Sequence, residues 1–596
     1  MKPVIYPHPK QMRLHGRDLR LVGNRIRLSY SSSEALNEAL LRFCKQHELQ
    51  LTIENPGAEQ LLIDIRRKTG TPESYELIVS ENGILLSAPD DAGIFYGLCS
   101  LQQILEQSVR NNKKTTLTAL HIRDEPDFRH RGILLDVSRC KVPTMETLFS
   151  MIDRFARLKL NQLHLYIEHT FAFANHRPVW EHASPFTAEE ILQIKQYCRS
   201  RFIDLVPNLN SFGHFERWLR HENYRSYAEC PDGFTHPLSG VRMTHGSTLK
   251  PNGHSLNLLH ELYSEYLPLF DSPYFNIGGD EPWELGHGWS ADMCRRSGTD
   301  RVYLSFMSKI QKLVSQHDRQ MMFWSDIVLQ HPESLSSLSS DLIALDWGYE
   351  ANHDFDKECR QIADCKIPFY VCPGTSSWNS LTGRTGNALG NLDNAASHGL
   401  VHGADGYLIT DWGDHGHHQY LPISYPGFVS GACHAWHHQA AASVDIEDLL
   451  RHMDSGEIAT IIPAMGRVPD LAPSTLRNGT IFNRLLFWDM QQEPPEISTI
   501  PKDQILACLN RFTEIREELE PLTGNQSTDE LANATDMAIH GLRRLTLIRG
   551  YHDDIPGLKR DISRIIDRHQ ELWLARNRPG GLQESVAYLR DCEAAL

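Results

Sequence analysis

Acidic, basic and aromatic side chains follow a series of short apolar runs in the middle of this sequence. The adjacent pair Asp280–Glu281 ends one such run, directly after Gly278 and Gly279. The two glycines let a ligand or a loop approach the backbone closely, and a carboxyl group at this point could protonate a leaving oxygen. Because a lone Asp-Glu pair is usually a solvated turn, its interpretation depends on the residues that accompany it.

Similar side chains end or follow the other apolar runs. They are Asp136, Arg139, Glu168, His169, His214, Trp324, Asp326, Asp346, Trp347, Tyr370, Trp412 and Asp414. Tryptophan offers a flat apolar face that suits the C–H face of a sugar ring, and Arg and Asp tips form charge-assisted hydrogen bonds with hydroxyls. Any one of these residues alone is more often structural, but their repetition at successive runs favours a shared site.

The apolar runs predict the elements that position these residues. Eight runs have the length and composition of strands: 131–137, 161–168, 202–208, 274–280, 320–326, 342–348, 367–372 and 405–412. Between them lie stretches with helical periodicity, including 144–158, 187–200, 257–270, 301–316 and 353–364. Eight alternating units predict an α/β fold, a (β/α)₈ TIM barrel, with its chemistry at the C-terminal ends of the strands. The long gap 209–273 is expected to hold a loop at that face.

The segments on either side of the barrel have different patterns. Residues 1–126 mix strands and helices, with a hairpin expected at 75–88 around a Glu-Asn-Gly turn. After residue 440 the strands stop, and helices are expected at 502–519, 529–549, 556–575 and 582–594. We therefore expect an N-terminal α+β domain at 1–126, the barrel at 127–440 and a C-terminal helical domain at 441–596.

Composition argues against several functional classes. The 596-residue chain carries a formal net charge of −16 and has a pI near 6.0, which disfavours binding to nucleic acid or to anionic membranes. The sequence starts without the apolar core of a secretion signal and has no apolar run of about 18 residues. The 12 cysteines form no CxxC pair and no secretion signal is seen, so we expect reduced thiols and a cytoplasmic location. We also expect no cofactor.

Four motifs, taken in order, resemble glycoside hydrolase family 20. They are GIFYGLCSLQQIL (93–105), RGILLDVSR (131–139), KLNQLH (159–164) and IGGDE (277–281). The first is similar to the small α/β domain that precedes the family's barrel, and the others to its first, second and catalytic strands. The resemblance covers about residues 60–440. It implies a retaining exo-β-N-acetylhexosaminidase that releases terminal β-linked GlcNAc or GalNAc from glycans.

The resemblance also implies catalytic roles. Glu281 would be the general acid and then the general base, while the substrate's own 2-acetamido oxygen attacks and forms an oxazolinium ion. Asp280 would orient the acetamide N–H and stabilise the positive charge, and Tyr370 would donate its hydroxyl to the acetamide oxygen. His214 would lie near the acid, with Glu168 as its carboxylate partner.

Substrate-binding residues are implied in the same way. Arg139 would bind the 3- and 4-hydroxyls, and Asp414 would contact hydroxyls at the far end of the sugar. The expected walls of the pocket are Trp324, Trp347, Trp378 and Trp412. The chain departs from the family pattern at Cys372, where Asp or Asn is usual, so the preference between the two sugars stays open.

Two other interpretations remain open. The segment DHGHH (414–418), together with His214, could form a metal-dependent hydrolase site if its imidazoles gathered on one rigid element. The second alternative is a glycan-binding protein without activity on the same fold. That alternative predicts loss of the acid, whereas both Asp280 and Glu281 are present.

Overall fold

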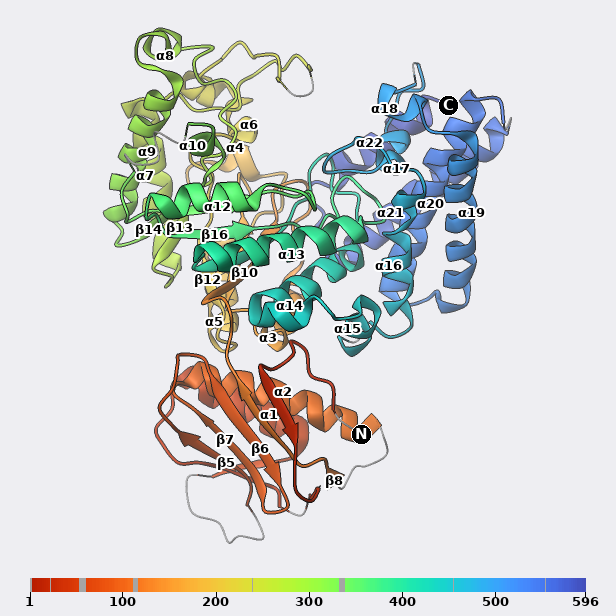
Figure 1. Ribbon diagram of the computed structural model, residues 1–596. Coiled ribbons are helices and arrows are strands. Elements are labelled where there is room, and N and C mark those ends of the chain that lie inside the picture. Colours follow the sequence, from red (N-terminus) through yellow and green to blue (C-terminus); the bar gives the residue numbers. More distant parts are fainter. Residues whose placement is uncertain are drawn as a thin grey trace.

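The structure is a computed structural model that describes residues 3–21, 23–52, 61–110, 116–237, 240–331, 338–453, 455–491, 493–551 and 554–596. It contains a seven-stranded sheet near the N-terminus, an eight-stranded parallel sheet in the middle and a group of helices toward the C-terminus. Figure 1 shows the N-terminal sheet below the barrel and the C-terminal helices beside it.

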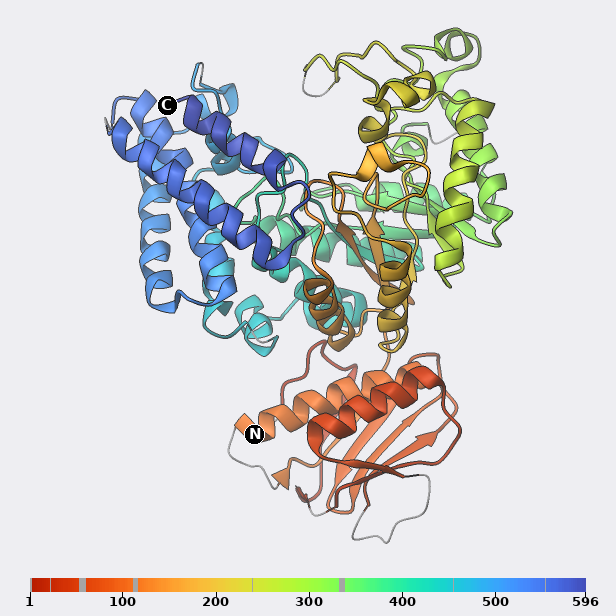
Figure 2. The same ribbon diagram turned by 180° about the vertical axis from the view of Figure 1, so that it is seen from behind.

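The N-terminal sheet has the order β1-β9-β6-β7-β5-β3-β4. Its strands are β1 (Gln11–Leu14), β3 (Arg25–Leu28), β4 (Gln50–Thr52), β5 (Leu61–Arg67), β6 (Tyr75–Ser80), β7 (Gly83–Ala88) and β9 (Leu120–Asp124), and β2 (Leu19–Arg20) pairs separately with β8 (Thr116–Leu117). The expected hairpin is present, with β6 and β7 antiparallel. Helices α1 (Glu34–His47) and α2 (Asp91–Arg110) lie along one face of this sheet, as Figure 2 shows.

The central sheet confirms the expected (β/α)₈ barrel. Its strands are β10 (His130–Asp136), β11 (Gln162–Tyr166), β12 (Asp204–Val206), β13 (Tyr274–Asn276), β14 (Gln320–Trp324), β15 (Ile343–Trp347), β16 (Phe369–Cys372) and β17 (Gly406–Asp411). All neighbours pair in parallel, in the order β12-β11-β10-β17-β16-β15-β14-β13. A parallel bridge between Asn208 and Asn276 joins the two ends, so the sheet closes on itself.

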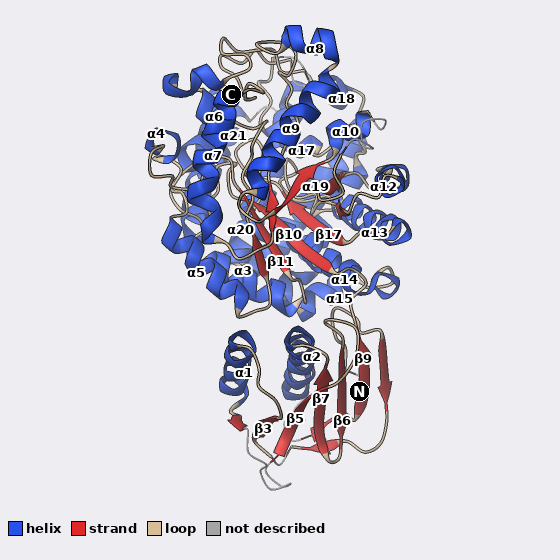
Figure 3. Ribbon diagram, turned by 90° about the vertical axis from the view of Figure 1, so that its left-hand side faces the viewer, coloured by secondary structure: helices blue, strands red, loops and turns tan. Residues whose placement is uncertain are grey.

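Helices surround the barrel strands (Figure 3). The longer ones are α3 (Met145–Arg157), α5 (Ala188–Arg199), α7 (Gly253–Tyr266), α9 (Thr299–Ser315), α12 (Phe355–Asp364), α13 (Thr385–His402) and α14 (Tyr425–Ala441). Capping residues set some helix starts, as in the capping box of Thr187 and Glu190 on α5. The sequence pattern predicted the first five but not the last two. Helix α14 is buried on every side from Tyr425 to Trp436, so it lacks the polar face that marks an amphipathic helix.

Short helices follow several barrel strands. They are α4 (Arg177–Trp180), α6 (Glu216–Leu219), α8 (Ala291–Ser297) and α10 (Asp326–Gln330). The C-terminal helices are α15 (Ile446–His452), α16 (Ile461–Met465), α17 (Ile481–Leu486), α18 (Pro495–Ser498), α19 (Lys502–Leu519), α20 (Gln526–Ile548), α21 (Ile555–Arg576) and α22 (Leu582–Ala594). In the described part of the chain, no helix has the length and apolarity needed to cross a membrane.

A buried ion pair joins the N-terminal sheet to the barrel. Lys159, just before β11, has a fully buried side chain whose Nζ lies 3.0 Å from Asp124 Oδ2 and 3.0 Å from Tyr75 Oη. Trp436 on α14 donates its Nε1–H to the same carboxylate at 3.0 Å, and the Lys159 ammonium lies 4.4 Å from the Trp436 ring centroid. Both charges are therefore compensated although neither contacts solvent.

Candidate active site

The Asp280–Glu281 pair lies on a tight turn that leaves β13. Gly278 and Gly279 have φ angles of 69° and 91°, and Glu281 itself has φ 46°. A Cβ on Gly278 would come within 2.1 Å of Asn210 Oδ1, so a larger residue would not fit there. The turn departs from the extended strand geometry, in which neighbouring side chains point to opposite faces. It thereby allows both carboxyl groups to share one site.

His214 connects the two carboxylates. Its Nε2 lies 3.1 Å from Asp280 Oδ2 and 3.7 Å from Glu281 Oε2. Burial lowers the pKa of His214, but the facing carboxylates, above all Asp280, outweigh that effect and raise it to about 9. His214 is therefore a cation at neutral pH. Glu168, the expected partner, is farther away, with its Oε1 3.8 Å from His214 Nδ1.

The environment of Glu281 suits a general acid. Burial raises the pKa of its carboxyl, the nearby His214 cation lowers it, and the Asp280 charge raises it again, with a net upward shift. Asp326 lies behind the pair, where its Oδ2 accepts a 3.5 Å hydrogen bond from the Glu281 backbone N–H. Burial, reinforced by the charges of Asp280 and Glu281, raises the pKa of Asp326 well above its usual range. Glu281 can thus carry a proton where an exposed glutamate would have lost it.

Three of the four expected tryptophans contact one tyrosine inside the barrel, and the fourth, Trp324, packs against Trp412. Trp324, Trp378 and Trp412 are almost fully buried and belong, with the partly buried Trp347, to one cluster. Tyr349 joins them: its ring stacks on Trp347 with ring centroids 5.1 Å apart and meets Trp378 edge-on at 5.0 Å. Its Oη accepts a 2.9 Å hydrogen bond from Trp412 Nε1. Tyr349 stands two residues after Trp347, a spacing that could have drawn attention to it.

The structure contradicts the role expected for Tyr370. This residue lies near the start of β16, where it pairs with Gly406, the first residue of β17. Its buried ring stacks on His130, the first residue of β10, with ring centroids 5.4 Å apart. Tyr370 therefore lies at the N-terminal end of the barrel, whereas Asp280 and Glu281 follow the C-terminal end of β13. Its hydroxyl is at the wrong end to contact a substrate at the carboxylate pair.

Arg139 lies among acidic and aromatic side chains beside this centre. Its Nη1 is 3.1 Å from Asp136 Oδ2 and its Nε is 3.2 Å from Glu168 Oε1. Its guanidinium lies over the rings of Tyr166 and Trp412, at 4.5 and 5.3 Å from their centroids. These contacts hold the planar group while part of it stays exposed, as a hydroxyl-binding arginine requires.

Asp414 lies on the loop after β17. Its φ is 40°, and its Oδ2 accepts a 3.2 Å hydrogen bond from Asn379 Nδ2. Burial raises the pKa of this carboxyl, and the neighbouring Arg139 lowers it in part. Asp414 thus lies close enough to Arg139 for their charges to interact, and its role in binding hydroxyls stays a prediction.

The C-terminal helix α22 forms one wall of the cavity in front of Glu281. This cavity has a volume of about 260 Å³ and is lined by Arg139, Glu168, His214, Glu281, Trp283 and, from α22, Glu584 and Tyr588, among others. Arg217 holds the helix in place through a bidentate pair with Glu584, with Nη1 to Oε2 at 2.7 Å. The sequence offered no sign that a helix from the end of the chain would reach the site.

The histidines of segment 414–418 do not gather around one point. His415 Nδ1 lies 3.3 Å from Asn379 Oδ1, and His418 Nε2 lies 2.9 Å from the Ser585 carbonyl oxygen. Among the described residues, three groups have ligand atoms close enough to share a metal ion, and none contains His415, His417 or His418. This arrangement disfavours the metal-dependent hydrolase built on that segment.

Two family models match the chain. "Glycosyl hydrolase family 20, domain 2" matches residues 2–125, and "Glycosyl hydrolase family 20, catalytic domain" matches residues 128–375. A beta-hexosaminidase of Porphyromonas gingivalis is 26% identical over 322 residues, which are 48% of this chain and 40% of that protein. The beta-hexosaminidase subunit beta of Rattus norvegicus is 23% identical over 370 residues, 55% of this chain and 66% of the relative. The chain thus spans less than two thirds of the length of these curated relatives.

Solved structures share the fold. The chitobiase of Flavobacterium johnsoniae superposes with a TM-score of 0.62 at 17% identity, covering 94% of this chain and 95% of the other. A beta-N-acetylhexosaminidase from Bacteroides fragilis gives a TM-score of 0.58 at 18% identity, covering 73% and 90%. The two family models together cover both the N-terminal sheet and most of the barrel that carries the carboxylate pair. The chain therefore belongs to glycoside hydrolase family 20.

Proposed function

We propose that this protein is a retaining exo-β-N-acetylhexosaminidase that releases terminal β-linked GlcNAc or GalNAc from glycans. The observation that carries the proposal is the triad of Glu281, Asp280 and His214 beside a cluster of four tryptophans. Family membership supports it, and so do the names of the relatives from P. gingivalis and R. norvegicus, which are both beta-hexosaminidases.

In the first step, protonated Glu281 gives its proton to the glycosidic oxygen as the bond from that oxygen to C1 breaks. The acetamide oxygen of the same sugar attacks C1 and forms the oxazolinium ring, so no protein nucleophile is needed. In the second step water attacks C1 from the vacated side and gives a proton to the Glu281 carboxylate. Two inversions at C1 leave the configuration retained.

Asp280 has the geometry to orient the acetamide. Its Oδ2 is held by His214 Nε2, and within the described residues no partner contacts its buried Oδ1. A buried carboxylate oxygen without a partner is costly, and an acetamide N–H would satisfy it. The negative charge would also stabilise the oxazolinium cation as it forms.

Tyr349 replaces Tyr370 as the proposed donor to the acetamide oxygen. Trp412 Nε1–H occupies one lone pair of the Tyr349 hydroxyl, and the Thr410 side chain is a second partner, so a bound acetamide oxygen would take the hydroxyl hydrogen in place of Thr410. Trp324, Trp347, Trp378 and Trp412 would then wall the acetamide methyl and the sugar ring. Arg139 and Asp414 would bind hydroxyl groups at the outer part of the pocket.

The test is hydrolysis of three 4-nitrophenyl β-glycosides: the N-acetylglucosaminide, the N-acetylgalactosaminide and the glucoside. The proposal predicts turnover of at least one acetamido sugar and none of the glucoside, because only the acetamido sugars carry the nucleophile. A thiazoline analogue of the intermediate should inhibit strongly. Equal turnover of the glucoside, or binding of all three sugars without turnover, would contradict the proposal.

We also propose that the protein works in the cytoplasm. All 12 cysteines are free in the structure and most are buried, which is consistent with a reducing compartment. Cell fractionation with an antibody against the native protein would test this, and recovery outside the cytoplasm would contradict it.

A further inference from the structure

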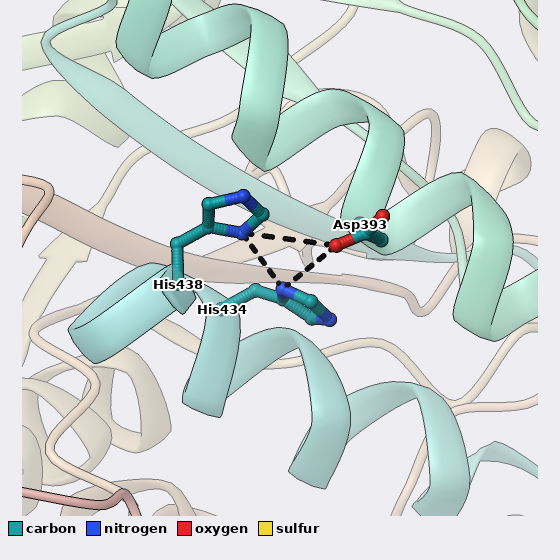
Figure 4. Close-up of side chains that lie close together, drawn as sticks. All are labelled: Asp393, His434 and His438. Atoms are coloured by element: carbon teal, nitrogen blue, oxygen red, sulfur yellow. Dashed lines mark hydrogen bonds and ion pairs between the residues drawn. The ribbon is translucent and has the colours of Figure 1, made fainter. Parts of the chain in front are cut away.

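Three metal-ligating side chains meet on the outer helices of the barrel, on elements that carry none of the proposed catalytic residues. Asp393 belongs to α13, and His434 and His438 lie one turn apart near the end of α14. Figure 4 shows both imidazoles turning their Nδ1 atoms toward each other and toward one oxygen of Asp393. We propose that Asp393, His434 and His438 form a binding site for a divalent transition-metal ion, with Zn²⁺ as the best fit.

The spacing of the three ligand atoms suits such an ion. The two Nδ1 atoms are 3.1 Å apart, and Asp393 Oδ1 lies 3.8 Å from that of His434 and 3.9 Å from that of His438. The point equidistant from three atoms with these separations is about 2.1 Å from each, which equals the usual zinc–nitrogen and zinc–oxygen bond length of about 2.0–2.2 Å. The ligands therefore need little rearrangement to hold the ion.

Hydrogen bonding explains only part of this arrangement, because the two Nδ1 atoms lie within hydrogen-bond distance of each other at 3.1 Å but the carboxylate does not join them. The Asp393 oxygen is too far from either imidazole for a hydrogen bond, for which about 2.7–3.2 Å is usual. The carboxylate nevertheless faces both nitrogens at nearly the same distance. A shared cation between the three atoms accounts for that symmetry, because the ion would replace the contact between the two imidazoles and bind all three ligands.

The chemistry of the three donors also suits a metal ion. His434 is almost fully buried, and burial, with a smaller contribution from His438, lowers its pKa to about 3. Its imidazole is therefore neutral at pH 7 and does not have to release a second proton before it coordinates an ion. Two imidazoles and one carboxylate form a donor set typical of zinc, with a water molecule as the fourth ligand. Asp393 is half exposed, which leaves room for that water.

The site would stabilise a junction. The helical geometry of α14 breaks at His437, between the two ligands, with φ −146° and ψ 80°. The next backbone N–H, that of His438, donates to Asp127 Oδ2 at 2.8 Å, and Asp127 also pairs with Lys10 from the N-terminal segment. An ion held by His434 and His438 would lock this break, and with it the contact between the barrel and the N-terminal region.

The experiment uses the full chain after dialysis against EDTA. Zinc sulfate is added, unbound ion is removed, and bound zinc is measured by atomic emission, with cobalt absorption in the visible range as a second probe. Asp393→Asn and His438→Gln should each bind one equivalent of zinc less than the parent chain and lose the cobalt bands of this site. The difference in zinc content between parent and variant is the readout, because two other groups also have metal-ligand spacing and could bind zinc in every sample. They are His214–Asp280–Glu281 and Asp346–His353–Glu358.

His398→Gln is the matched control. It removes an imidazole from the same helix α13, where His398 Nδ1 contacts the side chain of Asn394 at 2.7 Å and not the cluster. This variant should keep the full zinc content. Loss of a residue that only hydrogen-bonds a metal ligand weakens metal binding by about 10- to 100-fold. Loss of a ligand itself should weaken zinc binding by more than this. Thermal unfolding in EDTA, where all variants should match the parent within a few degrees, shows that they are folded.

Three results would overturn the proposal. The parent chain could bind no zinc at micromolar concentrations, or both ligand variants could keep the parent's zinc content and cobalt spectrum. The control could also lose as much zinc as the ligand variants, which would place the ion elsewhere. None of these readouts depends on hydrolytic activity, so failure of the proposed function would leave them unaffected.

Discussion

Replacing Tyr349 with phenylalanine separates the two candidate tyrosines. The substitution removes one oxygen and keeps the ring between Trp347 and Trp378. That oxygen accepts the 2.9 Å hydrogen bond from Trp412 Nε1, and under the proposed mechanism its hydrogen bonds the attacking acetamide oxygen. Tyr349→Phe should therefore affect both the chemical step and the stability of the pocket.

The two effects have different sizes. An acetamide without its donor is less often aligned for attack, and misplacement of a reacting group by about 1 Å costs about 100-fold in rate. At about 1.36 kcal/mol per tenfold, this corresponds to about 2.7 kcal/mol in the activation barrier. The buried Trp412 N–H also loses its acceptor, which should lower the free energy of unfolding by about 1–3 kcal/mol. The fall should appear mainly in kcat, because the rest of the sugar still binds.

The assay measures kcat and KM on the better acetamido glycoside, with urea unfolding in parallel. Tyr370→Phe is the control, because it removes the same atom at the other end of the barrel, and its turnover should stay within about twofold of the parent. A Tyr349→Phe protein with near-normal kcat would refute the assignment. A folded Tyr370→Phe protein with a 100-fold loss would restore the role that the family resemblance implied for Tyr370.

Three further outcomes are expected. The alkaline limb of the pH profile of kcat/KM follows loss of the Glu281 proton. Because the His214 cation, 3.7 Å away, lowers the pKa of Glu281, His214→Gln should move this limb up by about one pH unit. An unmoved limb would contradict the model of a charged pair. Asp124→Asn leaves the buried Lys159 ammonium without its counter-ion, so the free energy of unfolding in urea should fall by about 3–5 kcal/mol, and a loss below about 1 kcal/mol would show that water compensates the charge. Glu584→Gln weakens a partly exposed ion pair with Arg217 at the cavity wall, so KM for a chitobiose substrate should rise by about two- to fivefold while kcat changes little. The control is Glu593→Gln on the same helix α22, where Glu593 bonds Ser563, and it should leave KM unchanged.

The barrel could be predicted from sequence because its strands are buried on both faces. Such strands are short, nearly continuous apolar runs, as in GYLITD of β17, and the polar residues that follow them mark the C-terminal ends. Amphipathic helices such as α3 and α12 were equally visible. Helix α14 was missed because tertiary contacts bury it on all sides, which erases the periodicity on which the prediction depends.

Within the site, the positions at or just after strand ends were visible in the sequence. Glu281 lines the cavity, Asp280 contacts His214 in its wall, and Trp324 and Trp412 belong to the aromatic cluster, while their roles toward a substrate stay predictions. Tyr370 fails because a residue on a strand can lie at either end of the barrel, and only the pairing of β16 with β17 shows which end it occupies. Tyr349 escaped notice because it lies just outside the apolar run 342–348 that was expected to be the strand.

The sequence by itself determined the family, the barrel and the order of the carboxylates, tryptophans and arginine along it. These features depend on local composition and on the alternation of strands and helices, which a linear reading preserves. The tertiary structure alone decided that His214 joins Asp280 to Glu281, that α22 walls the cavity, and that Asp393 meets two histidines of another helix. These contacts join residues that are distant along the chain. The distances between them depend on how whole helices pack, and no short stretch of sequence carries information about that packing.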